Sequence, residues 1–274
     1  MKQLPVGYQL YSAREDAERD MPKVLKELKA LGYDGVEFAG FYGHSAKEIK
    51  AMLDDAGLAA VSSHVPAQAI AQDMFGTIAY HQALGCRYIA VPYLDDAHRP
   101  GAAGFPEMLR LIHRFGRLCR EAGIQLLYHN HDFEFVQLSG LYGLDFLYEA
   151  TDADILQTEL DVCWVKYAGE DPVSYLRKYA GRAPVVHLKD YVGKKGEGTP
   201  YALIGQSKKE DENVPFEFRP FGHGCQDAKA VVNAAIEANA QWLVVEQDLW
   251  YQRTPMEAAK MSIDTLYEIG VKQR

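Results

Sequence analysis

The chain has 274 residues, with 29 basic and 38 acidic side chains and a formal net charge of −9. Apolar residues make up 48% and charged residues 24%, a composition of folded proteins that excludes a disordered chain. The acidic balance argues against a nucleic-acid partner, because phosphate binding needs clustered lysine and arginine. No stretch approaches the roughly 18 apolar residues of a membrane-spanning helix, so no membrane partner is expected.

The four cysteines are far apart in the sequence, and none of them forms a CxxC pair. Such spacing is typical of reduced thiols. The N-terminal residues contain no apolar leader followed by a small-residue cleavage site. We therefore expect a cytoplasmic protein.

Eight short apolar runs alternate with segments of helical periodicity. Several of the helical segments end in glycine, which suits the residue after a helix because it adopts positive φ without a Cβ clash. Uninterrupted apolar runs are typical of parallel strands covered on both faces. The expected strands are Val6–Leu10, Gly35–Phe38, Leu58–His64, Tyr88–Val91, Ile124–Tyr128, Leu156–Leu160, Pro184–Leu188 and Trp242–Glu246.

This alternation predicts an α/β fold, a (β/α)8 TIM barrel that forms a single domain over residues 1–274. The main competitor is an open doubly wound sheet. No Gly-x-Gly-x-x-Gly turn follows the first strand, which disfavours a dinucleotide-binding version of that sheet. A long polar segment, residues 192–224, separates the seventh strand from the next helix, and we expect it to form a lid over the site.

Polar residues stand at the carboxyl ends of the expected strands, where TIM barrels place their chemistry. Asp161, His187 and Glu246 each end an apolar run directly, so a functional role is favoured for them. Carboxylates and imidazoles gathered at one rim need a cation to offset their repulsion and desolvation, and a divalent metal ion does this.

Other rim residues have a plain structural interpretation beside the functional one. Glu37 is more readily interpreted as a solvated rim residue than as a ligand. For His64, a hydrogen bond to a backbone carbonyl and a functional role are equally good interpretations. His129 and His131 lie one pleat apart on one face of the fifth strand, but spacing does not say whether that face points to the barrel axis. Trp164 is either a core aromatic or a platform for stacking a sugar.

Four strings, taken in order, resemble the xylose isomerase-like TIM-barrel family. They are YHNHDFEF at 128–135, TELDVCWV at 158–165, VHLKDY at 186–191 and WLVVEQD at 242–248. The family contains sugar phosphate isomerases and epimerases, ketose 3-epimerases and inosose dehydratases, and its barrels often dimerise or tetramerise. The resemblance implies a small sugar or polyol as substrate, and it makes a homo-oligomer an open expectation.

The resemblance also implies one divalent ion held by four residues, here Glu134, Asp161, His187 and Glu246. A His or Asn within 129–131 is an alternative to Glu134. Three carboxylates and one imidazole suit Mn²⁺, Mg²⁺ or Co²⁺, with Zn²⁺ as a further option. The ion would stabilise the enediolate formed when a proton leaves the carbon next to a carbonyl.

Glu134 and Glu246 would then act as the catalytic acid–base pair, which predicts an isomerase or epimerase. The substrate-binding candidates are His64, His129, His131, Trp164, Lys189 and Glu37, and Asp190 is a candidate for orienting His187.

An inosose-type keto-polyol dehydratase is the alternative. Trp164 stands where ketose epimerases have a histidine, Lys189 stands near their arginine, and the HLKD and WLVVEQD strings are more similar to those of inosose dehydratases. An endonuclease-four-type DNA repair nuclease and a non-catalytic sugar binder are further alternatives. The charge of −9 disfavours the nuclease.

Overall fold

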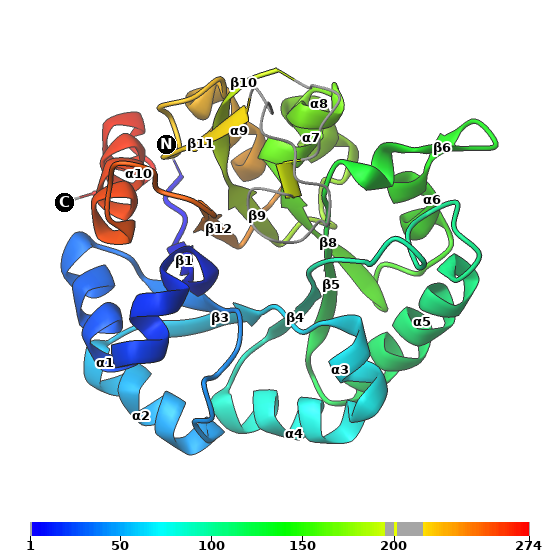
Figure 1. The fold of residues 1–274 in the computed structure, drawn as a ribbon, viewed down its shortest axis with the longest axis horizontal. Coiled ribbons are helices and arrows are strands. Elements are labelled where there is room, and N and C mark those ends of the chain that lie inside the picture. The colour runs from blue at the N-terminus through cyan, green and yellow to red at the C-terminus, as the bar shows by residue number, and fades with distance from the viewer. Residues whose placement is uncertain (1, 195–199, 202–215, 274) are drawn as a thin grey trace.

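A computed structural model describes residues 2–194, 200–201 and 216–273 of the chain. Eight parallel strands form a nearly closed barrel in the order β3-β2-β1-β12-β9-β8-β5-β4, with helices outside it (Figure 1). Between β3 and β4 the barrel is closed by a single bridge from His64 to Ala90, where the Val65 amide donates to the Ala90 carbonyl at 2.9 Å. The fold is therefore the predicted TIM barrel.

The eight barrel strands follow the eight predicted apolar runs closely. They are β1 (Val6–Gln9), β2 (Gly35–Phe38), β3 (Ala59–Ser63), β4 (Tyr88–Val91), β5 (Gln125–His129), β8 (Leu156–Asp161), β9 (Val185–Leu188) and β12 (Trp242–Val245). Val61, Ala90, Leu127, Val185 and Val244 form a small apolar cluster of their own inside the barrel. Their strand neighbours point the other way, into the larger core beneath the helices.

The helices cover the outside of the barrel. They are α1 (Arg14–Leu31), α2 (Ala46–Ala56), α3 (Ala67–Gln72), α4 (Met74–Leu84), α5 (Phe105–Glu121), α6 (Gly143–Glu149), α7 (Val162–Ala168), α8 (Pro172–Lys178), α9 (Ala228–Glu237) and α10 (Pro255–Ile269), with 3-10 turns η1 (Leu10–Ala13) and η2 (Phe133–Phe135). Gly32, Gly57 and Gly85 end α1, α2 and α4 in the left-handed conformation, as their place before each apolar run predicts. Within the described ranges, no helix has both the length and the apolar content needed to cross a membrane.

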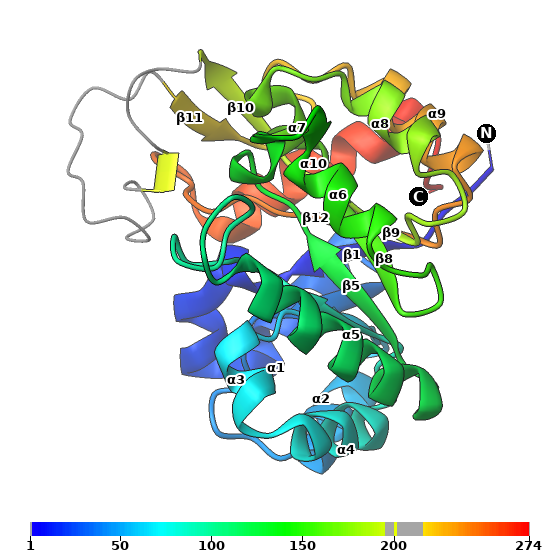
Figure 2. The ribbon, with the colours of Figure 1, turned by 90° about the vertical axis from the view of Figure 1, so that its right-hand side faces the viewer.

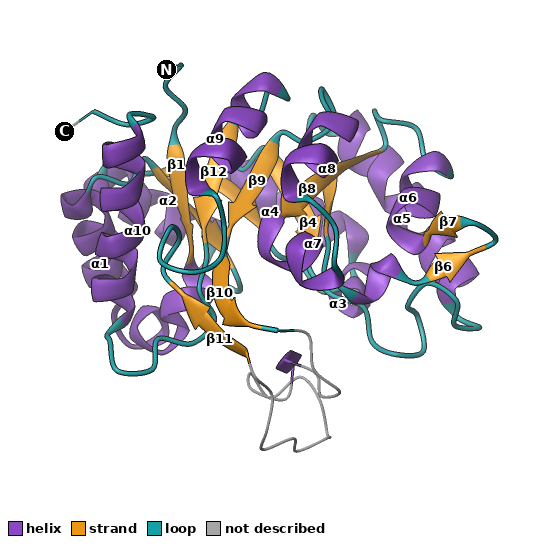
Figure 3. Cartoon of the chain, turned by 90° about the horizontal axis from the view of Figure 1, so that it is seen from above, coloured by secondary structure: helices purple, strands orange, loops and turns teal. Residues whose placement is uncertain are grey.

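Two antiparallel ribbons project from the barrel. One is β6 (Gln137–Leu138) with β7 (Leu141–Tyr142), and the other is β10 (Asp190–Gly193) with β11 (Phe216–Arg219). The β10–β11 ribbon points away from the two chain termini (Figures 2 and 3). It overlaps the segment 192–224 predicted as a lid but begins two residues earlier, at Asp190; residues 195–199 and 202–215 of that segment are outside the described part of the chain.

Asp190 anchors the base of this ribbon. Its carboxylate accepts the amides of Tyr191 at 2.8 Å, Gly222 and Gly224 at 3.0 Å, and Gln226 at 3.1 Å. A Cβ atom on Gly224 would lie 2.3 Å from an Asp190 oxygen, so only glycine fits there. The expectation that Asp190 orients His187 is therefore wrong, because both of its oxygens are occupied by loop amides.

Candidate active site

Strand pairing brings the rim residues together at the carboxyl end of the barrel. The β8–β9 register sets Asp161 opposite His187, and the β9–β12 register sets Val244 opposite His187. Glu246 follows Val244 by two residues and so returns to the same face. The β5–β8 register sets His129 opposite Glu159.

Four side chains form a group that could hold a metal ion: His129, Asp161, His187 and Glu246. Each offers one ligand atom, and these atoms lie within 4.8 Å of one another. All four side chains are buried. Three of the four predicted ligands are therefore close together, and His129 stands with them in place of Glu134.

Asp161 has one carboxylate oxygen fixed and one without a hydrogen bond. As the N-cap of α7, its Oδ1 accepts the amides of Cys163 at 2.7 Å and Trp164 at 3.0 Å. Its Oδ2 is buried and finds no hydrogen-bond partner among the described residues. Burial raises the pKa of Asp161 to about 7. A buried carboxylate oxygen without a donor is a position that a cation would stabilise.

His129 is in the chemical state that a metal ligand requires. Burial, reinforced by nearby His187 and His64, holds the pKa of His129 well below its usual value, so the ring is neutral. Its Nδ1 is buried without a hydrogen-bond partner in the described part of the chain, and its Nε2 faces Asp161. Only a neutral imidazole has the free lone pair that a cation needs.

His187 links the group to a second set of polar residues. Its Nδ1 lies 3.1 Å from Oε2 of Glu246, and its Nε2 lies 2.8 Å from Oε1 of Glu37 and 3.1 Å from Oε1 of Glu159. Burial alone would lower the pKa of His187, but the negative charges of Glu37 and Glu159 hold it well above the usual value. These carboxylates orient the ring, the role that the sequence assigns to Asp190.

Glu37 is fully buried, so its interpretation as a solvated rim residue is wrong. Gln9 and Ser62, on the two neighbouring strands, both donate to its carboxylate. His64 Nε2 lies 3.1 Å from both Glu37 Oε1 and Glu159 Oε2. His64, His129, Glu159 and His187 form a second group of metal-ligating side chains, but its carboxylate is already held by two imidazoles.

Lys189 lies buried between two carboxylates. Its Nζ is 3.2 Å from Glu246 Oε2 and 2.8 Å from Asp248 Oδ1, and it lies 5.1 Å from the centre of the Trp164 ring. Burial would lower its pKa, but Asp248 and Glu246 raise it above the usual value, so the amine stays protonated. Trp164 is fully buried and supports Lys189 and His131 from behind.

The buried charges do not balance. Glu37, Glu159, Asp161, Glu246 and Asp248 face the cations His64, His187 and Lys189, which leaves an excess of two negative charges when all are ionised. A divalent cation bound to His187 would displace the proton of that ring, and its two positive charges would offset the carboxylates in place of that proton. Together with the unpartnered atoms of Asp161 and His129, this shows that the residues fit a divalent ion.

Glu134 lies apart from this group. It is buried in η2, where its carboxylate accepts the Tyr128 hydroxyl at 2.6 Å and the His131 amide at 2.7 Å. Burial raises its pKa to about 8. The 3-10 turn after β5 directs this side chain behind the strand, so the structure does not bring it to Asp161, His187 and Glu246.

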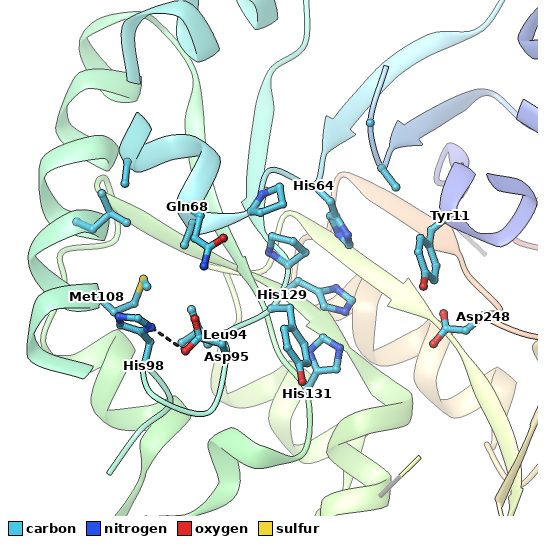
Figure 4. A pocket seen from close by; sticks show the side chains of 18 of the residues that line it. Tyr11, His64, Gln68, Leu94, Asp95, His98, Met108, His129, His131 and Asp248 are labelled. Carbon is cyan, nitrogen blue, oxygen red and sulfur yellow. Dashed lines mark hydrogen bonds and ion pairs between the residues drawn. The ribbon is translucent and has the colours of Figure 1, made fainter. Parts of the chain in front are cut away.

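A cavity of about 720 Å³ opens onto the group (Figure 4). Its inner end is formed by His64, His129, His131, Lys189, Glu246 and Asp248. An outer arm continues from there between α3 and α5, lined by Pro66, Ala67, Ala71, Leu94, Met108 and Leu111. Four of the six predicted substrate-binding residues therefore line the cavity, while Trp164 and Glu37 lie behind its wall.

The sequence interpretation did not single out Glu159 or Asp248, which both belong to this polar network. A signal for each is present in the sequence. Glu159 precedes Asp161 by two residues, and Asp248 follows Glu246 by two, so each shares a strand face with a predicted ligand.

The chain is thus a TIM barrel with a buried group of histidines and carboxylates, which could hold a metal ion, at the carboxyl ends of its strands. Residues 25–269 match the family model described as xylose isomerase-like TIM barrel. The chain belongs to this family.

Inosose dehydratases are among the known relatives of this chain. An inosose dehydratase from Geobacillus kaustophilus (strain HTA426) is 24% identical over 178 residues, an alignment that covers 57% of this chain and 57% of that relative. The chain thus spans little more than half the length of that relative.

Two solved structures share the fold over nearly the whole chain. A sugar phosphate isomerase/epimerase from Parabacteroides distasonis ATCC 8503 has a TM-score of 0.80 at 23% identity, covering 100% of this chain and 96% of that one. A D-allulose 3-epimerase from Methylomonas sp. has a TM-score of 0.68 at 14% identity, covering 98% and 99%. At such identities these likenesses show the fold alone.

Proposed function

We propose that the protein is a divalent-cation-dependent isomerase or epimerase of a small sugar or polyol. The observation that carries this proposal is the buried group at the inner end of the cavity, in which Asp161 Oδ2 has no hydrogen-bond partner among the described residues and His129 Nε2 faces it at 3.9 Å. A mere sugar-binding protein has no need of such costly buried charges next to its cavity.

The proposed ligands are His129, Asp161, His187 and Glu246. Two carboxylates and two imidazoles suit a cation of intermediate hardness such as Mn²⁺ or Co²⁺, and they fit Zn²⁺ better than the originally predicted set with three carboxylates does. Glu134 is left with a positioning role, since it holds the Tyr128 hydroxyl and the turn that carries His131.

A bound divalent cation would polarise the substrate carbonyl and offset the negative charge that develops on its oxygen. The side chains supply the proton transfers. Glu246 faces the cavity. Burial opposes its ionisation, but Lys189 and His187 outweigh burial, lower the pKa of Glu246 and keep it ionised. An Oε atom of Glu246 can therefore accept the α-proton. The Lys189 ammonium stays protonated beside it and can donate a hydrogen bond to the substrate oxygen that becomes negative.

A keto-polyol dehydratase is the second candidate, favoured by the similarity to an inosose dehydratase. The first step is the same removal of an α-proton by Glu246. The reaction then loses a β-hydroxyl as water, and Lys189 Nζ is the protonated group at the inner end that can donate to the departing oxygen.

Proton exchange tests the proposal without a known substrate. The Mn²⁺-loaded protein is incubated in D₂O with a panel of ketoses and keto-inositols, and NMR follows loss of the α-proton signal. We expect exchange with at least one member, its loss after chelation and its return with Mn²⁺. Glu246→Gln should slow exchange by about 100-fold or more, whereas the exposed control Glu149→Gln should not change it.

The reaction products distinguish the isomerase or epimerase from the dehydratase. An epimer or an aldose–ketose pair supports the first, and a product lighter by one water supports the dehydratase. Exchange that persists unchanged after complete metal removal would show that the proposal is wrong.

A further inference from the structure

The cavity is larger than a single sugar ring requires, and its inner end and outer arm differ in polarity. Cavities of about 300–1,000 Å³ hold ligands of drug size, and this one has a volume of about 720 Å³. The groups needed for the proposed chemistry all lie at the inner end. The outer arm extends past them, so a bound monosaccharide would leave it unfilled.

The outer arm has an apolar surface built by two helices and a loop. α3 contributes Ala67 and Ala71 together with the polar side chain of Gln68, and α5 contributes Met108 and Leu111. The small alanines on α3 leave open the space that larger side chains would fill. In Figure 4, Met108 and Leu94 stand on the side of the cavity away from Tyr11 and Asp248, with the imidazoles of the inner end between.

The polar residues at the mouth of the outer arm disfavour an anion. Asp95 and Glu107 are carboxylates, and His98 Nδ1 donates to Asp95 Oδ1 at 2.7 Å. Lys189 is the one lysine or arginine among the described residues that line the cavity, and its charge is already shared by Glu246 and Asp248. A phosphate ester would therefore meet carboxylates without a free cation to balance it.

We propose that the substrate is a neutral keto-sugar glycoside, whose ring with its carbonyl lies at the inner end and whose apolar substituent, an aryl or alkyl aglycone, fills the outer arm. This proposal rests on the proposed function, which places the sugar ring beside Glu246 and Lys189. It gives the outer arm a role in selecting the substrate rather than in the chemistry.

Calorimetric binding to the Mn²⁺-loaded protein tests this with unreactive glucosides as probes. We expect phenyl β-D-glucopyranoside to bind about tenfold or more tightly than methyl β-D-glucopyranoside, because burial of a phenyl ring adds favourable transfer free energy. Glucose 6-phosphate and methyl β-cellobioside should bind no better than the methyl glucoside. Equal affinities for the phenyl and methyl probes, no binding of any probe, or tighter binding of the phosphate or the disaccharide would each overturn the proposal.

Two variants on one helix localise the effect. Ala71→Phe places a ring in the outer arm and should remove the tenfold preference for the phenyl probe while leaving methyl glucoside affinity within about twofold. Ala69→Phe is the matched control, since Ala69 is also exposed on α3 but does not line the cavity. If Ala71→Phe lost its affinity for both glucosides, or if Ala69→Phe also lost the preference for the phenyl glucoside, the outer arm would not hold the substituent.

A Mn²⁺ titration of the same samples separates this proposal from the proposed function. If Mn²⁺ binds but the phenyl preference is missing, the outer arm has been misassigned and the metal-dependent chemistry stands. If Mn²⁺ does not bind, the proposed function itself fails.

Discussion

The Nε2 atom of His129 lies 3.9 Å from Oδ2 of Asp161, too far for a hydrogen bond, although both atoms are deeply buried. The two side chains come from different strands and are held independently, Asp161 by the amides at the start of α7. Two polar atoms that face each other without bonding leave room for a third partner between them. The first prediction follows from this gap.

Asp161→Asn should weaken Mn²⁺ binding by about 100-fold or more, because it removes the negative charge from the proposed ligand while keeping the N-cap oxygen. Calorimetric titration with Mn²⁺ measures this. The exposed Asp152 provides a matched control, and Asp152→Asn should bind Mn²⁺ as the unchanged protein does. Equal affinities for the two variants would contradict the proposed ligand set.

Glu134→Gln should change how stability depends on pH. The folded protein keeps the Glu134 proton up to about pH 8, whereas the unfolded chain releases it near 4.5. The contribution of Glu134 to the free energy of unfolding is therefore present below pH 4.5 and is lost as pH rises through 8, by about 5 kcal/mol. Urea unfolding at a series of pH values should show this fall in the unchanged protein relative to Glu134→Gln.

The same variant also tests the position of Glu134. Since its carboxylate is engaged by Tyr128 and His131, Glu134→Gln should keep its Mn²⁺ affinity within about threefold. A loss comparable to that of Asp161→Asn would restore Glu134 as a ligand in place of His129.

Lys189→Met should destabilise the metal-free protein by about 3–5 kcal/mol, because Glu246 and Asp248 would keep buried charges without their cation. Adding Asp248→Asn should recover part of this loss, which a double-mutant cycle of unfolding free energies would reveal. Lys50→Met breaks the exposed pair with Asp54 and should cost no more than about 1 kcal/mol. If both lysine variants were equally stable, the charge balance at the inner end would need another explanation.

Asp190→Ala should loosen the base of the β10–β11 ribbon, because four amides lose their shared acceptor. Hydrogen exchange followed by mass spectrometry should show faster exchange over residues 216–226. Asp171→Ala removes an N-cap from α8 instead, where it accepts the amides of Val173 and Ser174. That control should leave exchange over 216–226 unchanged.

The barrel could be predicted because each strand is a short apolar run that follows a glycine or another turn. Tyr88–Val91 and Gly35–Phe38 have the predicted bounds, since the residues on both sides are poor strand formers. Asp161, His187 and Glu246 could be predicted to meet because the carboxyl ends of parallel strands share one rim.

The fourth residue of the candidate metal-binding group depends on the path of the backbone after β5, and the spacing of residues in the sequence does not contain that path. Beyond His129 the chain leaves the sheet and enters the η2 turn, so the alternation of faces no longer applies to Glu134. The interpretation of Glu37 as a solvated rim residue is wrong for a related reason. Its partners Gln9 and Ser62 are close only through the β1–β2 and β2–β3 registers, which a single sequence does not reveal.

Asp190 fixes where the chain leaves the barrel after β9 and where it returns after β11, because one carboxylate holds amides from both sides. Between the two ribbon strands, the described residue Tyr201 is buried against the rings of His131 and Trp164 and donates to Asp132. Doubling the length of a flexible loop costs only about 0.6 kcal/mol once its ends are fixed. A change in the length of this loop that keeps Tyr201 should therefore leave the proposed metal-binding group in register, whereas a graft that removes Tyr201 should disturb the packing of His131.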